Sequence, residues 1–150
     1  MTEITFHVNA ADKLDYACRL LRATQKKAAK VLVCAPPDVL KHLSGQLWAM
    51  APVAFLPHCF ADAAPAVLAL SPVVLVSDLS NLSDKGLGHD VLLHLGADLP
   101  TGFERFARLI EVVSQADADV QPARQRWTHY KKRGYAMTRY DTVSKETSTH

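Results

Sequence analysis

An α/β fold with a mostly parallel central sheet is predicted by the alternation of strand and helix patterns along this chain of 150 residues. Short runs of Val, Leu and Cys without polar alternation indicate strands that are buried on both faces, as parallel sheets require. Between them, apolar residues recur three or four positions apart, which is the period of an amphipathic helix. Such alternation favours strand–helix–strand units and a layered domain.

The first half of the chain predicts a strand, a helix, a strand and a second helix. Residues 3–8 alternate between apolar and polar side chains, and residues 31–35 form an apolar run that Pro36 and Pro37 end. The two helices are indicated by stripes at Leu14, Ala17, Cys18 and Leu21 and at Leu40, Leu43, Leu47 and Met50. Trp48 lies about one residue, or roughly 100°, off the second stripe. We therefore expect Trp48 outside the core.

The second half is less regular. Residues 51–71 and 77–90 are expected to be mostly irregular, and residues 73–76 and 91–95 read as buried strands. A third helix is predicted by the apolar spacing of Phe103, Phe106, Ala107 and Ile110, followed by a last strand at 110–113. Residues after Tyr140 are rich in Thr, Ser, Lys and Glu, so we expect a domain over 1–140 and a disordered tail over 141–150.

Composition indicates one globular domain of the cytoplasm. Hydrophobic residues make up 49% of the chain, enough for a full core, but no apolar run approaches the roughly 20 residues that span a bilayer. The N-terminus lacks the basic start and long apolar run of a signal peptide. Cys18, Cys34 and Cys59 are odd in number and widely spaced, which favours reduced core thiols over disulfides.

No catalytic, cofactor-binding or metal-binding residue is predicted. The glycines form no phosphate-binding loop, and Asp78 after its strand is more typical of a turn. His89, Asp90 and His94 lack a further ligand at useful spacing, and adjacent His58 and Cys59 point to opposite sides of an extended chain. The alternative, an α/β enzyme acting on a nucleotide or phosphorylated substrate, would use Asp78 and Asp84 at strand ends.

A basic, aromatic helix is predicted from Pro122 to Gly134. Proline suits the first turn of a helix, and glycine suits its stop. The spacing turns Ala123, Trp127 and Tyr130 inward, and the flanking positions hold basic residues: Arg124, Arg126, Lys131, Lys132 and Arg133.

The charge of this helix is unbalanced. Residues 1–119 carry 10 basic against 13 acidic side chains, whereas residues 120–150 carry 7 against 2. Exposed helices ordinarily mix both signs, so this excess predicts an anionic partner. Nucleic acid and an acidic peptide both satisfy that requirement, and a plain solvated face is the competing interpretation.

Several local motifs resemble the chi subunits of bacterial DNA polymerase III. They are Leu47-Trp48, Phe55-x-Pro57-His58, the run Ala123-Arg-Gln-Arg-Trp-x-x-Tyr130, and Gly134 followed by an aromatic residue. The resemblance extends over essentially the whole chain, with residues 60–100 matching only in outline. It implies a single three-layer Rossmann-like domain without a nucleotide, and a non-catalytic accessory subunit of the clamp-loader complex in DNA replication.

The resemblance also implies partners and a peptide-binding site. Chi subunits pair with the psi subunit and bind the acidic C-terminal tail of single-stranded-DNA-binding protein, which ends in a Phe carboxylate; a DNA helicase is a further candidate. Here Trp48 and Phe55 would supply apolar walls, and Arg124 with Trp127 the charged rim. Thr128 stands where relatives place a Lys, so Lys131 and Lys132 are expected to supply that charge.

Two expectations concern other surfaces. A permanent partner such as psi should cover apolar residues that no helix stripe uses, and residues 63–70 are a candidate. Direct nucleic-acid binding by the basic helix remains the alternative to peptide binding.

Overall fold

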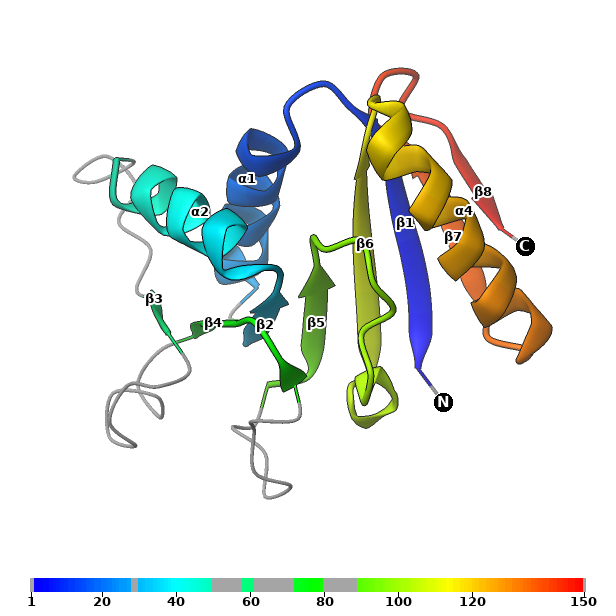
Figure 1. Ribbon diagram of the computed structural model, residues 1–150, viewed down its shortest axis with the longest axis horizontal. Helices are drawn as coiled ribbons and strands as arrows, with labels where there is room; N and C mark the ends of the chain where they lie inside the picture. Colours follow the sequence, from blue (N-terminus) through cyan, green and yellow to red (C-terminus); the bar gives the residue numbers. More distant parts are fainter. Residues whose placement is uncertain (1, 28–29, 50–57, 61–71, 80–88, 150) are drawn as a thin grey trace.

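The structure is a computed structural model that describes residues 2–27, 30–49, 58–60, 72–79 and 89–149 (Figure 1). The described strands form one sheet in the order β3-β4-β2-β5-β6-β1-β7-β8, parallel except for the last pair. The strands are β1 (Glu3–Ala10), β2 (Val31–Cys34), β3 (His58–Phe60), β4 (Val73–Val76), β5 (Val91–His94), β6 (Arg108–Ser114), β7 (Met137–Asp141) and β8 (Thr147–Thr149). The helices are α1 (Lys13–Lys26), α2 (Pro37–Ala49), the 3-10 turn η2 (Phe103–Arg105) and α4 (Asp117–Lys132).

Helices cover both faces of the sheet, so the predicted three layers and mostly parallel sheet are confirmed. One buried cluster joins α1 and α2 to the sheet through Leu21, Leu43 and Leu47, which meet strand residues such as Val33. A second cluster, on the opposite face, joins α4 to the sheet through Ala123 and Tyr130. Figure 1 shows α1 and α2 next to the half of the sheet that contains β2, and α4 next to β6, β1 and β7.

The predicted helix at residues 103–110 is wrong. Only η2 is helical there, and β6 then runs between β5 and β1, parallel to both. Phe106 packs on the α4 face and Ile110 on the opposite face, so the apolar residues never shared one side. Strand pairing on both edges of β6 therefore overrode a helical spacing.

The basic helix begins earlier than predicted. Ala116 is its N-cap, Asp117 and Asp119 occupy the first turn, and Pro122 lies inside the helix. The two acids suit the positive end of the helix dipole. At the other end the prediction holds, because Gly134 has a φ of 79°, the left-handed conformation that stops a helix.

The expected disorder after Tyr140 is also corrected. β7 pairs with β1, and β8 folds back antiparallel onto β7. The reversal is held by Asp141, whose Oδ1 accepts hydrogen bonds from the backbone N–H groups of Val143 at 2.9 Å and Ser144 at 3.1 Å. An Asp that bonds to the backbone two residues on is a turn former. The polar tail thus makes an edge strand without burying apolar side chains.

Arg126 was predicted to flank the inward-facing aromatic residues of the basic helix, but its side chain is buried between the helix and the sheet. Its Nε donates to Oε2 of Glu111 at 3.0 Å, and Nη1 donates to the carbonyl of Ala97 at 2.7 Å. The same Oε2 accepts from the Tyr130 hydroxyl at 2.8 Å, and Oε1 lies 2.5 Å from Nδ1 of His94. We call Glu111, Arg126, His94 and Tyr130 the buried polar network; each is at most 3% exposed.

The network shifts the pKa values of its members. Burial by itself would raise the pKa of Glu111, but His94, Arg126 and Tyr130 together hold it below its ordinary value. Burial and the adjacent carboxylate both raise the pKa of the Tyr130 hydroxyl. Glu111 is therefore a carboxylate, and Tyr130 a neutral donor, at neutral pH.

Removing the cation of this network should be costly. Arg126→Met leaves the Glu111 carboxylate buried without its ion pair, so the free energy of unfolding should fall by about 3–5 kcal/mol. Urea unfolding followed by circular dichroism measures this change. Arg124→Met, the same substitution on an exposed position of the same helix, should change it by less than about 0.5 kcal/mol. Equal losses in the two variants would contradict a special role for the buried pair.

Glu111 should also make the free energy of unfolding depend on pH in the acid range. Its pKa is lower in the folded protein than in the unfolded chain, where it is about 4.3, so its contribution is complete above that pH and is lost as the pH falls below it. The pKa values of the Asp119 and Asp141 carboxyls are also lowered, by hydrogen bonds from backbone N–H groups among other causes. Glu111→Gln should remove only the part of the slope that Glu111 contributes. Urea unfolding of the wild type and of Glu111→Gln at a series of acid pH values tests this. If the free energies of unfolding of the two proteins fall in parallel as the pH is lowered, the role of Glu111 is refuted.

Candidate peptide-binding groove

A groove of about 430 Å³ opens between α4 and the sheet at the carboxyl ends of β1 and β6. Its apolar floor comes from the strands and its wall from the helix: Phe6, Val8 and Val113 from the sheet, and Val120, Ala123 and Trp127 from α4. Polar atoms stand at its rim, on Asn9, Ser114, Arg124 and Arg139. The adjacent strands β1 and β6 lead to helices on opposite faces, and α/β sheets commonly bind ligands at such a point.

An aromatic contact fixes the shape of the groove. The rings of Phe6 and Trp127 lie edge to face, with centroids 5.1 Å apart. Phe6 is fully buried, whereas Trp127 is partly exposed. Trp127 thus packs against the sheet on one side, as the helical spacing predicted, and remains open to the groove on the other.

Two guanidinium groups flank this apolar surface. Arg124 is exposed on α4, and Arg139 on β7 is paired in register with Phe6, so its side chain stands on the α4 face of the sheet. Arg139 is 3.8 Å from Oδ2 of Asp141, which also accepts from the Asn9 amide at 2.7 Å. The rim therefore offers two Arg side chains that can bind a carboxylate.

Thr128 and Lys131 extend the same flank of α4. At about 100° per residue, Arg124, Thr128 and Lys131 fall within about 60° of one another on the helix surface. The Thr128 hydroxyl donates to the carbonyl of Arg124 at 3.0 Å, so it is turned toward its own helix. Lys131 is exposed and is the next cation along this flank.

The N-terminus of α4 is fixed by Asp119. One carboxylate oxygen accepts from the Ser114 N–H at 2.7 Å, and the other accepts from Lys13 Nζ at 2.9 Å. Burial would raise the pKa of this carboxyl, but these bonds together hold it below its usual value. The groove wall is thus tied to β6 and α1 as well as to the buried polar network.

The structure does not bring Trp48 into this groove. Trp48 lies on α2, which covers the face of the sheet opposite α4. As predicted it lies outside the core: it is 55% exposed and stands 5.2 Å from the ring of His58, with Phe60 nearby in β3 also exposed. Phe55, the other predicted apolar wall, lies outside the described residues, as do Asp84 and residues 63–70.

Two of the residues considered above for enzyme chemistry, Asp78 and His94, line a second cavity of about 300 Å³, together with Cys34 and others. Burial, with smaller contributions from Asp78 and Glu111, raises the pKa of the Cys34 thiol to about 11, which disfavours the reactive thiolate. In the described part of the chain no three His, Cys, Asp or Glu side chains lie close enough to hold a metal ion. No described helix has the length and apolar character needed to cross a membrane.

Sequence reasoning missed Arg139 and the strand residues that form the floor. Phe6 and Val8 were identifiable as one face of the first strand, but which helix would cover that face was not. Arg139 lay in the segment whose strand, β7, was not predicted. The available signal was that Arg139 lies two positions after Met137, so that in a strand both side chains would stand on the same face.

Comparison with known protein families and sequences agrees with the resemblance found in the sequence motifs. Residues 1–138 match the family model described as DNA polymerase III chi subunit, HolC. The chain is 29% identical over 145 residues to DNA polymerase III subunit chi of Pseudomonas aeruginosa, covering 91% of this chain and 94% of that protein.

The fold also occurs elsewhere. The C-terminal domain of the DEAD-box protein Dbp5 superposes with a TM-score of 0.62 at 13% sequence identity, over 95% of this chain and 91% of that one. At this identity the similarity concerns the fold alone, and it agrees with the predicted Rossmann-like architecture.

Proposed function

This chain belongs to the family of DNA polymerase III chi subunits, and we propose that it joins the psi subunit of that polymerase to the acidic C-terminal tail of single-stranded-DNA-binding protein. In this role it contributes binding surfaces to DNA replication, and the nucleotidyl transfer belongs to other subunits. The observation that carries the proposal is the apolar groove with Arg124 and Arg139 at its rim.

The groove matches the chemistry of a peptide end that carries a terminal Phe. Its volume lies within the usual range of ligand pockets, and its apolar floor and Trp127 wall suit an aromatic side chain. The terminal carboxylate would lie at the rim, where a guanidinium can form two parallel hydrogen bonds to it. Acidic residues upstream would follow the flank of α4 past Thr128 to Lys131.

The psi subunit would bind a different surface. Trp48 and Phe60 are large apolar side chains that remain exposed in the described part of the chain, and both lie on the α2 side of the sheet. Exposed aromatic residues are typical anchors of permanent interfaces. Because the sheet separates this surface from the groove, both partners could bind at once.

Arg124→Glu should weaken tail binding selectively. The substitution turns an attraction for the carboxylate into repulsion, and central interface positions of this type lose about 2 kcal/mol, or roughly thirtyfold in affinity. Fluorescence anisotropy of a labelled acidic peptide ending in Phe gives the dissociation constants.

The wild-type affinity for this peptide should also fall with rising salt, since exposed charges are screened. An affinity that stays constant from low to high salt would mean that the basic residues of α4 do not contribute to peptide binding.

The matched control is Arg22→Glu, the same charge reversal at an exposed position of α1. It should leave peptide affinity within about twofold, because α1 lies on the other face of the sheet. A folded Arg124→Glu variant that binds the peptide as tightly as the wild type would refute the groove.

Trp48→Ala should give the opposite pattern. Psi binding should weaken by about 2 kcal/mol or more, because an exposed aromatic anchor is removed, while the tail peptide should bind as before. Calorimetric titration with purified psi and with the peptide measures both affinities. If Trp48→Ala reduced tail binding and left psi binding intact, the two surfaces would have been assigned the wrong way round.

A further inference from the structure

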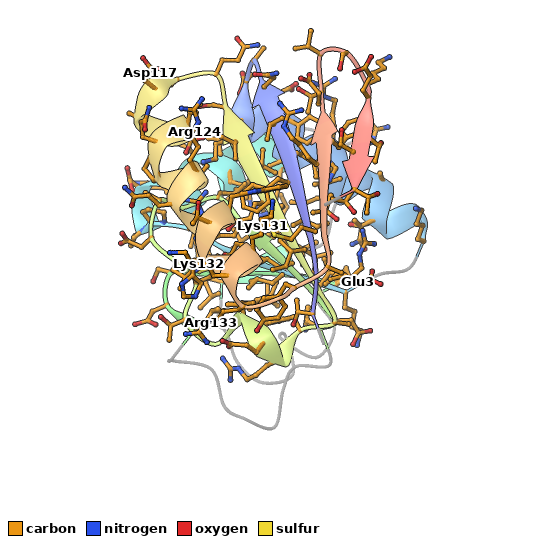
Figure 2. All side chains as sticks on the ribbon, turned by 90° about the vertical axis from the view of Figure 1, so that its right-hand side faces the viewer. Glu3, Asp117, Arg124, Lys131, Lys132 and Arg133 are labelled. Atoms are coloured by element: carbon orange, nitrogen blue, oxygen red, sulfur yellow. The ribbon has the colours of Figure 1, made fainter. Side chains whose placement is uncertain are left out.

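The C-terminal end of α4 carries three consecutive exposed cations, Lys131, Lys132 and Arg133. No ion pair joins any of them to another described residue, in contrast to Lys13, Arg126 and Arg139, which each have an acidic partner. Figure 2 shows them at the end of α4 away from Asp117, toward the end of the molecule where β1 begins with Glu3. This end of the helix presents concentrated positive charge.

Helix geometry separates two of these cations from the groove. Measured around the helix axis from Arg124, Trp127 and Lys131 are turned toward the groove by about 60° and 20°, respectively. In the other direction, Lys132 is turned by about 80°, and Arg133 lies on the far side at about 180°. Thr128, which lies on the path proposed for the peptide, is turned by about 40° in the direction of Lys132. Lys132 therefore borders that path, and Arg133 lies outside it.

The favourable interaction of these cations with the helix dipole does not by itself indicate that they bind a partner. Cations at a helix C-terminus are stabilised by about 0.3–1 kcal/mol each, which explains why they are tolerated there. The nearby η2 turn contributes an exposed acid, Glu104, and a basic residue, Arg105, which donates hydrogen bonds to the carbonyls of Leu79 and Gly102. At this end of the molecule the exposed cations Lys131, Lys132 and Arg133 outnumber the exposed acids Glu3 and Glu104.

We infer that Lys132 and Arg133 bind the phosphate backbone of single-stranded DNA, at a site distinct from the tail groove. Phosphate contacts need exposed Lys and Arg side chains and no shaped apolar pocket, which is what this end of α4 offers. Peptide anchors need an apolar pocket, and that lies on the other flank. The inference rests on the membership of a DNA polymerase family and not on tail binding.

The test uses the full chain and a labelled oligothymidylate of about 20 nucleotides, titrated by fluorescence anisotropy from about 20 to about 200 mM KCl. The wild type should bind at low salt and weaken steeply as salt rises. Lys132→Glu/Arg133→Glu should abolish this binding. The neutral pair Lys132→Gln/Arg133→Gln should lower the slope of log affinity against log salt by about 1.4, since each lost contact to a single strand removes about 0.7.

Two controls make the result specific. Arg124→Glu should reduce binding of the acidic tail peptide and leave the oligothymidylate bound. Lys132→Glu/Arg133→Glu should abolish oligothymidylate binding and weaken the peptide by much less than Arg124→Glu does. Failure of the tail groove would thus appear in a different measurement from failure of the DNA site. Circular dichroism confirms folding, and the Gln pair replaces the Glu pair if the latter does not fold.

Three outcomes overturn the inference. The first is a wild-type protein that does not bind the oligothymidylate at the lowest salt. The second is an unchanged affinity and salt slope in the Gln pair. The third is loss of the tail peptide, and not of DNA, when Lys132 and Arg133 are reversed, which would make these cations a continuation of the peptide site.

Discussion

The carboxylate of Glu111 is the constraint on which the α4 side of the molecule depends. It lies in the middle of β6, fully buried, and accepts hydrogen bonds from Arg126 and Tyr130 of α4 while contacting His94 of β5. A buried charge is costly unless every lone pair is satisfied, so α4 must keep the one register and rotation that bring Arg126 and Tyr130 to it. That rotation places Ala123 against the strands, Trp127 beside Phe6, and Arg124 at the rim.

The sheet divides the molecule into two surfaces with different chemistry. On the α4 face, an apolar groove is bordered by Arg124 and Arg139, with more cations along the helix. On the α2 face, Trp48 and Phe60 are exposed apolar groups. The proposed function requires two binding surfaces that do not compete, and the groove and the exposed aromatic residues lie on opposite faces of the sheet. The carboxyl ends of β1 and β6 carry the groove, although neither is followed by a glycine-rich phosphate loop.

Much of the fold was predictable because it follows from local patterns. Parallel strands buried on both faces are continuous apolar runs, as in residues 31–35 and 73–76, and the stripes of α1 and α2 repeat at the helical period. The errors arose where pairing outweighed such patterns. Phe103 to Ile110 have a helical spacing, yet they feed a strand that gains hydrogen bonds from β5 and β1. The polar tail had nothing to bury, yet an Asp141 turn returned it to the sheet edge.

The sequence by itself determined the layered α/β class, the basic aromatic helix with its stop at Gly134, and the exposure of Trp48, because each depends on residues within a few turns of one another. Only the tertiary structure decided that Arg126 is buried on Glu111, that Arg139 joins Arg124 at the rim, and that Trp48 lies on the far face from both. These outcomes depend on strand order and on which face each helix covers. Both are set by contacts between residues far apart in the chain, which helical and strand periods do not encode.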